Sequence, residues 1–308
     1  MAERRAVIDV GTNSVKLLVA EVSGRIVHPL LEQSEQTRLG HGFYPHLRLQ
    51  PDAITQTARA CAGFAEAATQ LGAAPIRVIA TSAARDAVNA AELANAVEQA
   101  CGLPLEIISG EHEADWVFQG VTSDPALAAL PLLILDVGGG STEFILGEGA
   151  QATFRRSFPL GSVRLLEQFH LSDPPATGEL AACRAQLLSF IAHEVRPALG
   201  AHARSPALQL VGTGGATTIL ARMHHRMADF DRARIEATRL TRAQVSGECD
   251  RLWGLSLAAR RELPGLPPKR ADVILFGAAI YEAVMMELEL AELRVSTRGL
   301  RYAAVMLE

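Results

Sequence analysis

The chain lacks several features that would mark particular classes of protein. Its 308 residues include only four cysteines, Cys61, Cys101, Cys183 and Cys249, which stand far apart and form no Cys-x-x-Cys pair. That spacing argues against a disulfide framework or a zinc site and fits a reducing compartment. No apolar run is long enough for a membrane helix, and the N-terminus enters a strand pattern without a signal-like region. We therefore expect a cytoplasmic protein that does not bind membranes.

An excess of positive charge is also lacking. The formal net charge is −5, so binding of nucleic acid through bulk charge is not expected. Lysine is rare: Lys16 and Lys269 are the only two. The preference for arginine over lysine would suit bidentate binding of phosphate, although a compositional bias of the genome explains the preference more simply. Hydrophobic residues make up 49% of the chain, which is enough for the cores of two domains.

What the chain does contain is one glycine-rich hairpin pattern written twice. The first copy reads DVGTNS from Asp9 to Ser14, and the second reads DVGGGS from Asp136 to Ser141. Each copy follows an apolar run and precedes another, which predicts strand, tight turn and strand. Backbone N–H groups of such turns bind anions, and an Asp at the strand end is a hard ligand for Mg²⁺. A single copy could be a plain hairpin connection, but two copies suggest two similar domains that grip one ligand from both sides.

The remaining pattern alternates strands and helices, which is typical of an α/β fold. In the first half it predicts strands near 6–10, 15–22, 26–34, 76–81 and 104–109, and helices near 51–71, 90–101 and from 111. In the second half it predicts strands over LLILDV, TEFILGEG and ATFRRSF and near 208–212, helices near 161–169, 176–196, 214–222, 241–252 and 268–290, and a C-terminal strand and helix. An Ala/Pro stretch ending at Pro131 marks a domain boundary. We expect domains over 1–124 and 125–297.

Carboxylates stand at two positions suited to catalysis. Glu113 lies in the string ISGEHEA, where a strand ends and a helix begins. It could only complement the helix dipole, or it could act as a general base that deprotonates water beside a phosphate. Glu143 follows Asp136 in the second hairpin, where the two side chains can converge and hold a divalent cation. The alternative for Glu143 is a solvent-facing strand residue. HExxH is incomplete because Trp116 replaces the second His.

Two further segments rich in small residues directly follow expected strands. The string VGTGGATT from Val211 to Thr218 predicts a strand, a glycine turn and a helix start, which is an anion site or a close packing turn. It completes neither a dinucleotide fingerprint nor a P-loop. The string ATSAARDAVN carries Arg85, which could face a cleft or only solvate a helix start.

Together these strings resemble the exopolyphosphatase/guanosine pentaphosphate phosphatase (Ppx/GppA) family of the actin–sugar kinase–Hsp70 superfamily. The supporting strings are, in order, DVGTNSVKLLV, RLGHGF, ATSAARDAVN, ISGEHEA, LDVGGGSTEF, PLGSVRL, VGTGGATT, LPGLPPKRADVI and STRGLR. The resemblance implies two ribonuclease H-like domains with an interdomain cleft, and a last helix, about 298–308, that packs back on the first domain.

The resemblance also implies roles for residues. It makes Glu113 the general base and places Asp136 and Glu143 at Mg²⁺ or another divalent cation. The phosphate-binding residues that it implies are Asp9, Gly11, Thr12, Asn13, Ser14, Arg85, Gly138, Gly139, Gly140, Ser141, Thr142, Gly212, Thr213, Gly214 and Gly215.

The expected activity is Mg²⁺-dependent release of terminal phosphate from inorganic polyphosphate. Hydrolysis of guanosine pentaphosphate (pppGpp) is the alternative, because both substrates present a terminal phosphoanhydride. A non-catalytic nucleotide or (p)ppGpp sensor would not need Glu113, and a kinase or ATPase of the same superfamily is a fourth option. Long family members continue into a helical region with a His-Asp motif, which this sequence lacks. The sequence looks like the short, two-domain form, and a homodimer is expected only from the family.

Overall fold

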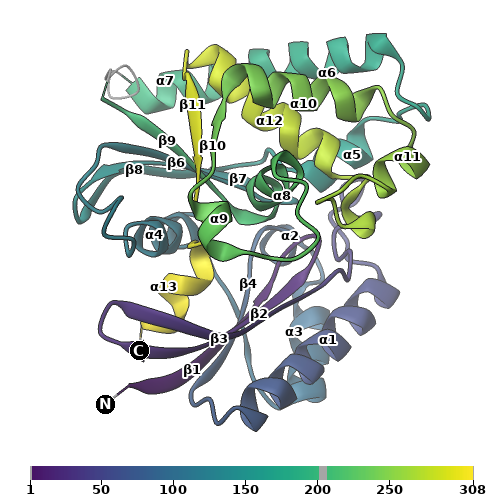
Figure 1. Cartoon of the computed structure of the whole chain (residues 1–308). Coiled ribbons are helices and arrows are strands. Elements are labelled where there is room, and N and C mark those ends of the chain that lie inside the picture. The colour runs from purple at the N-terminus through teal and green to yellow at the C-terminus, as the bar shows by residue number, and fades with distance from the viewer. Residues whose placement is uncertain (1, 201–206, 308) are drawn as a thin grey trace.

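The chain folds into two α/β lobes, each built around one sheet (Figure 1). The computed structural model describes residues 2–200 and 207–307. The first lobe is the lower one in Figure 1 and the second lobe is the upper one, and both chain ends lie at the first lobe.

The first sheet has five strands in the order β3-β2-β1-β4-β5. They are β1 (Glu3–Val10), β2 (Val15–Ser23), β3 (Ile26–Glu35), β4 (Ile76–Ala80) and β5 (Leu105–Ile107). The pairs β1–β2 and β2–β3 are antiparallel, whereas β4 runs parallel to both β1 and β5. The helices of this lobe are α1 (Pro51–Gln70), α2 (Ser82–Asp86), α3 (Ala90–Cys101) and α4 (Gly110–Val121). Proline begins α1, where its missing N–H costs nothing.

The second sheet repeats this arrangement and adds an edge strand. Its order is β10-β11-β9-β6-β7-β8, with β6–β7 and β7–β8 antiparallel and with β9 parallel to β6 and β11. The strands are β6 (Leu132–Val137), β7 (Thr142–Glu148), β8 (Gln151–Phe158), β9 (Gln209–Thr213), β10 (Arg239–Thr241) and β11 (Glu292–Val295). The expected α/β class with a repeated unit is confirmed.

The helices of the second lobe are more numerous. They are α5 (Ser162–Gln168), α6 (Thr177–Phe190), the π-helix η1 (Ile191–Val195), α7 (Arg196–Leu199), α8 (Gly214–His224), α9 (Arg232–Glu236), α10 (Arg242–Trp253), α11 (Leu257–Arg261), the 3₁₀ turn η3 (Pro268–Arg270) and α12 (Ile274–Glu287).

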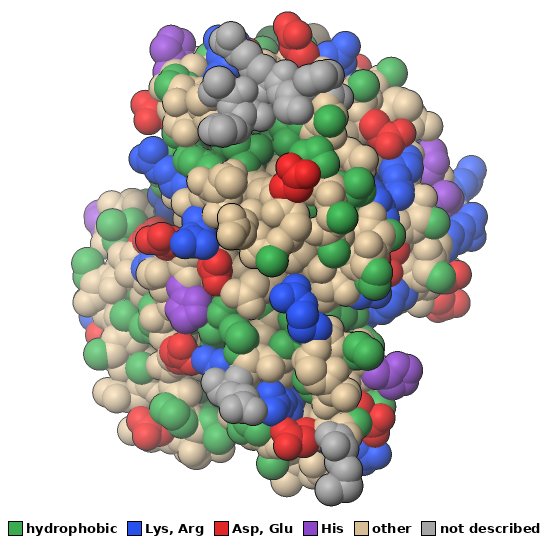
Figure 2. All heavy atoms as spheres, turned by 90° about the vertical axis from the view of Figure 1, so that its left-hand side faces the viewer, with side chains coloured by type: hydrophobic (Ala, Val, Ile, Leu, Met, Phe, Trp, Pro, Cys, Tyr) green, Lys and Arg blue, Asp and Glu red, His purple; other side chains and the backbone are tan. Residues whose placement is uncertain are grey.

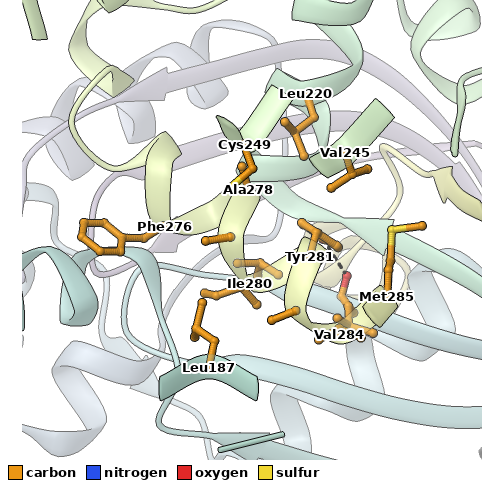
Figure 3. Packing of buried hydrophobic residues seen from close by; sticks show 14 of the residues in the cluster. Leu187, Leu220, Val245, Cys249, Phe276, Ala278, Ile280, Tyr281, Val284 and Met285 are labelled. Carbon is orange, nitrogen blue, oxygen red and sulfur yellow. Dashed lines mark hydrogen bonds between the residues drawn. The ribbon is translucent and has the colours of Figure 1, made fainter. Parts of the chain in front are cut away.

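Alternation along the strands divides most of the buried apolar residues among three large cores. On β1, Ile8 faces α1 and α3, whereas the preceding residue, Val7, faces the opposite side of the sheet. That side shares one core with Ile134 of the second sheet, and α4 and α13 (Leu300–Met306) lie between the two sheets. On its far face, the second sheet packs Leu133 against α6, α8, α10 and α12. Figure 3 shows this last core around Tyr281 and its neighbours on α12. The layers are therefore helix, sheet, helix, sheet, helix.

The last helix, α13, returns to the first lobe and packs against β1, β2 and α4 (Figure 1). Arg301 on this helix donates to the carbonyl of Leu17, 2.9 Å away, which fixes α13 on the first sheet. The boundary between residues 124 and 125 stays a prediction.

Several expected elements differ in their bounds. The helix expected over 176–196 ends at Phe190 and continues as the π-helix η1, and the helix expected from 268 starts as a 3₁₀ turn before α12. The strand expected over 104–109 is only β5. The short elements α2, α9, β10 and α11 have too few residues to show a period, so the sequence pattern missed them.

The exposed surface mixes charges of both signs. On the face shown in Figure 2, acidic and basic side chains are interspersed with scattered hydrophobic ones. Within residues 2–200 and 207–307, no helix has the length and apolarity to cross a bilayer.

Candidate active site

A cleft of about 610 Å³ lies between the lobes and is lined by both glycine hairpins. Most of the residues expected at the site border this one cavity. These are Asp9, Gly11, Thr12, Asn13, Ser14, Glu113, Asp136, Gly138, Gly139, Gly140, Ser141, Glu143, Thr213, Gly214 and Gly215.

The two hairpins close their turns with the same hydrogen bond. The N–H of Gly11 donates to the carbonyl of Ser14 at 3.0 Å, and the N–H of Gly138 donates to that of Ser141 at 2.9 Å. The repeated sequence pattern therefore produces a repeated backbone, with polar groups at the mouth of the same cleft.

The hairpins also touch each other. A Cβ placed on Gly140 would lie 2.8 Å from Oγ1 of Thr12 and 2.4 Å from Oγ of Ser82. A Cβ on Gly139 would come within 3.0 Å of the Thr12 side chain. Glycine is needed in the second loop because the first lobe occupies the space that a side chain would take.

The third glycine turn approaches the second hairpin. Gly214 begins α8 with a φ of +84°, and a Cβ there would lie 2.2 Å from Oδ1 of Asp136. Only glycine combines this conformation with so close an approach. The N-terminus of α8 therefore opens beside the cleft, where its free N–H groups favour an anion.

The expected base, Glu113, sits in the first turn of α4. Ser109 caps this helix by accepting a hydrogen bond from the N–H of His112. Arg85 on α2 donates through Nη1 to Oε2 of Glu113 at 2.9 Å and to the carbonyl of Ile108 at 3.1 Å. Burial and then the negative charge of Glu143 raise the pKa of Glu113 well above its usual value, while Arg85 opposes the rise. A carboxylate with a raised pKa is a better proton acceptor near neutral pH.

Glu143 and the two hairpin aspartates form an acidic group in the cleft. Burial raises the pKa of Asp9, and it raises the pKa of Asp136 to about 6. Burial and the neighbouring Asp136 raise the pKa of Glu143 to about 7, against hydrogen bonds from Ser157 (2.7 Å) and Ser141 (2.8 Å). Burial is the main cause in all three cases, so a cation bound beside these carboxylates would stabilise their charged form.

These carboxylates suit a hard cation. Glu143 accepts its hydrogen bonds through Oε1, and within the described residues no donor reaches the carboxylates of Asp9 or Asp136. The chemistry of this oxygen set fits Mg²⁺ or a similar divalent ion. No cluster of three or more His, Cys, Asp or Glu residues close enough to hold a metal occurs in 2–200 or 207–307. Substrate phosphate oxygens and water would therefore have to complete the coordination.

Cations that sequence reasoning did not assign to the site also line the cleft. Lys16 lies opposite Asp9 in the β1–β2 pair, and burial lowers its pKa. Arg270 reaches across from the second lobe and donates through Nη2 to Oγ of Ser14 at 2.8 Å. Burial lowers the pKa of Arg270 to about 10. Lys269 borders the cleft too, so both lysines of the chain are there. The rarity of lysine was a signal in the sequence that could have drawn attention to Lys16 and Lys269.

Three expected phosphate-binding residues lie elsewhere. Arg85 binds Glu113, as described above, and is not among the residues that line the cavity. Thr142 is fully buried and donates to the carbonyl of Leu160, and a Cβ on Gly212 would lie 2.8 Å from Thr217. Their contact with phosphate therefore stays a prediction; in the structure Arg85 pairs with a carboxylate, and Thr142 and Gly212 pack against neighbouring residues.

The sequence and the fold match known proteins over nearly the whole chain. The family model for the Ppx/GppA phosphatase family matches residues 18–306. Exopolyphosphatase 2 of Mycobacterium tuberculosis is 35% identical over 294 residues, which cover 92% of this chain and 91% of that protein.

Solved structures agree. The crystal structure of the Aquifex aeolicus member of the Ppx/GppA protein family gives a TM-score of 0.81 at 28% identity, covering 99% of this chain and 97% of that one. An exopolyphosphatase-like protein gives a TM-score of 0.88 at 27% identity, covering 98% of each chain. The chain therefore belongs to the Ppx/GppA phosphatase family and has its fold of two actin-like domains.

Proposed function

We propose that the protein is an exopolyphosphatase that hydrolyses the terminal phosphate from inorganic polyphosphate with the help of Mg²⁺. The observation that carries the proposal is a buried carboxylate with a raised pKa, Glu113, held by Arg85 at a cleft that two anion-binding hairpins also line. The 35% identity to a protein named Exopolyphosphatase 2 supports the choice of substrate.

In this proposal the chain's residues divide the work of phosphoryl transfer. N–H groups of the two hairpin turns and of the α8 N-terminus bind the terminal phosphates, and Lys16 and Arg270 neutralise part of their charge. Glu113 accepts a proton from a water that attacks the terminal phosphorus. Asp136 and Glu143, with Asp9 nearby, would hold Mg²⁺, which when bound would neutralise charge on the phosphate oxygens. Catalysis is then mostly positioning and charge stabilisation.

Hydrolysis of pppGpp uses the same terminal chemistry and stays the alternative, and a sensor is the reading that remains if nothing is hydrolysed. The four free cysteines support a cytoplasmic location, where thiols stay reduced. A homodimer stays a prediction.

The test compares phosphate release from polyphosphate of several lengths, pppGpp and ATP in the presence of Mg²⁺. Glu113→Gln is expected to lower kcat by about 10²- to 10⁴-fold, as loss of a general base does, without lowering affinity. Glu111→Gln is the matched control, because Glu111 lies in the same helical turn with its side chain 74% exposed. Full activity of Glu113→Gln would refute the role of Glu113. Release from pppGpp alone would move the function to that substrate, and binding without any release would favour the sensor.

A further inference from the structure

Two strings of the sequence, RLGHGF and PLGSVRL, have no role in the site described so far. The structure places them against each other across the two lobes. The second string leads into α5 of the second lobe, and the first is a loop of the first lobe. Oε1 of Glu167 on α5 accepts a hydrogen bond from the N–H of Gly42 at 2.7 Å and lies 3.4 Å from Nδ1 of His41. We call α5 together with residues 38–44 the clasp.

Arg164 on α5 is the centre of the clasp because it contacts three different elements. Its Nε donates to the carbonyl of Gly140 in the second hairpin at 2.9 Å. Its Nη2 pairs with Oδ2 of Asp86 on α2 at 3.1 Å, and its guanidinium lies 4.4 Å from the ring centre of Tyr44. One side chain thus joins the phosphate loop of the second lobe to two segments of the first.

Asp86 is the direct neighbour of Arg85, and both belong to α2, a helix of only five residues. Arg85 holds Glu113 through its bond at 2.9 Å. A continuous series of contacts therefore runs from Gly140 through Arg164 to α2 and on to Glu113. Arg85 and Asp86 are adjacent residues in one short helix, so a displacement of Asp86 also displaces the backbone of Arg85.

We propose that Arg164 is a positioning residue that couples closure of the two lobes to the placement of Glu113. When the second hairpin approaches the first lobe around a substrate, Arg164 binds Asp86 and sets α2, so that Arg85 aims the carboxylate of Glu113 into the cleft. In an open state the bonds from Arg164 to Asp86 and Tyr44 are absent, and Glu113 loses this support. The benefit of such coupling is that the base is in place only when substrate is enclosed.

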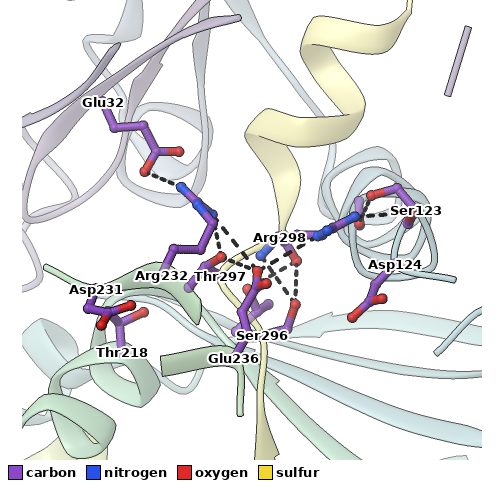
Figure 4. A network of polar contacts seen from close by, with 12 residues as sticks. Glu32, Ser123, Asp124, Thr218, Asp231, Arg232, Glu236, Ser296, Thr297 and Arg298 are labelled. Atoms are coloured by element: carbon purple, nitrogen blue, oxygen red, sulfur yellow. Dashed lines mark hydrogen bonds and ion pairs between the residues drawn. The ribbon is translucent and has the colours of Figure 1, made fainter. Parts of the chain in front are cut away.

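Three other contacts between the lobes do not reach α2. In the network of Figure 4, Arg232 on α9 pairs with Glu32 on β3 at 2.8 Å, and Arg298 donates to the carbonyl of Ser123 at 3.1 Å. Arg38 pairs with Asp272 at 2.8 Å. None of these three contacts involves α2 or Glu113, and Arg155 on β8, which pairs with Asp115 on α4 at 2.8 Å, does not contact α2. They hold the lobes together, whereas Arg164 also reaches the base.

The inference rests on the proposed function for its kinetic test. The variants are Arg164→Met, Arg164→Lys, Asp86→Asn and the double variant Asp86→Asn/Arg164→Met. We expect the Met and Asn variants to lower kcat by about tenfold or more with little change in KM, since misplacing a catalytic group lowers the rate. Lysine keeps the charge for Asp86 but not the Nε bond to Gly140, so partial rescue is expected. The double variant should be no worse than the more damaging single one, because the two residues act as a pair.

Two carboxylates offer matched controls. Glu106→Gln breaks an ion pair of similar exposure with Arg77 inside the first lobe, where the side chains are 45% and 25% exposed, and it should leave kcat unchanged. Glu32→Gln breaks a pair between the lobes that does not reach α2, so it should raise KM without lowering kcat. The proposal is overturned if Arg164→Met and Asp86→Asn behave like Glu106→Gln, or if their effects on kcat multiply in the double variant.

A second readout does not depend on activity. Backbone amide hydrogen exchange over residues 81–86 and 109–114 should be faster in Arg164→Met than in the wild type, and unchanged in Glu106→Gln, because loss of the Arg164 bonds loosens α2 and its contact with α4. If the wild type releases no phosphate from any substrate, the proposed function fails, and the exchange comparison alone decides the coupling. Equal exchange in Arg164→Met and the wild type would refute it.

Discussion

The two glycine hairpins close their turns with the same backbone hydrogen bond, but they differ in the residue that pairs with the aspartate at the end of the first strand. In the first hairpin, Asp9 pairs across the strands with Lys16, and in the second, Asp136 pairs with Glu143. The same position thus carries a cation in one hairpin and a second carboxylate in the other. The first hairpin places a cation beside its carboxylate, whereas the second places two carboxylates together, whose charge an added cation would have to balance.

The turns of the two hairpins also differ in the side chains that they carry. Thr12 and Asn13 give the first turn side chains, and both are buried at the cleft. Gly139 and Gly140 give the second turn none, because Thr12 and Ser82 fill that space. A duplicated unit has therefore diverged into one loop that supplies side-chain donors and one that supplies backbone and acidity. The repeated fold places both turns at the cleft, and the contact between the lobes limits which side chains fit in the second turn.

The largest effect is expected when the second hairpin receives the cation of the first. Glu143→Lys should abolish activity, by about 10³-fold or more, because several kcal/mol of metal-assisted stabilisation would be lost. Glu143→Gln should retain more activity and require a higher Mg²⁺ concentration. The measurements are phosphate release against Mg²⁺ concentration and thermal unfolding of each variant, since Glu143 is 1% exposed. A Glu143→Gln enzyme with normal Mg²⁺ dependence would contradict the assignment.

A smaller change gives the second turn a side chain. Gly140→Ala should lower activity by roughly 100-fold, because the new Cβ would force apart two loops that must converge on one phosphate. Gly63→Ala on α1 is the control, since nothing lies within 4 Å of a Cβ there. That substitution should leave activity unchanged and stabilise the helix by about 0.5–1 kcal/mol. Unchanged activity in Gly140→Ala would show that the loops do not act together.

The last change is a shift of the pH profile, which follows from removing the cation beside the acidic groups. Arg85 lowers the pKa of both Glu113 and Glu143. Arg85→Met removes this positive charge, so both pKa values rise further and the acid limb of the kcat/KM profile moves to higher pH. Arg85→Lys keeps the charge and should leave that limb closer to the wild type. An acid limb that stays in place in Arg85→Met would mean that neither carboxylate controls it.

Much of the site could be read from the sequence because its parts are local. Apolar runs flanking DVGTNS and DVGGGS predicted the hairpins, and the structure confirms the pairing of Asp136 with Glu143. The same spacing places Lys16 opposite Asp9, which the sequence reasoning overlooked. The proposed base at Glu113 also followed from a strand end and a helix start that lie close together along the chain.

The rest depended on residues that meet only after folding. Arg270 reaches Ser14 from 256 positions away, Arg164 joins Gly140 to Asp86, and Arg85 donates to Glu113. The helices, strands and repeated turns could be predicted from the sequence, since hydrophobic periodicity and glycine act between residues close together along the chain. The partners of the charged side chains depend on the folded structure, because burial in the cleft and the packing of one lobe on the other select which charges must pair.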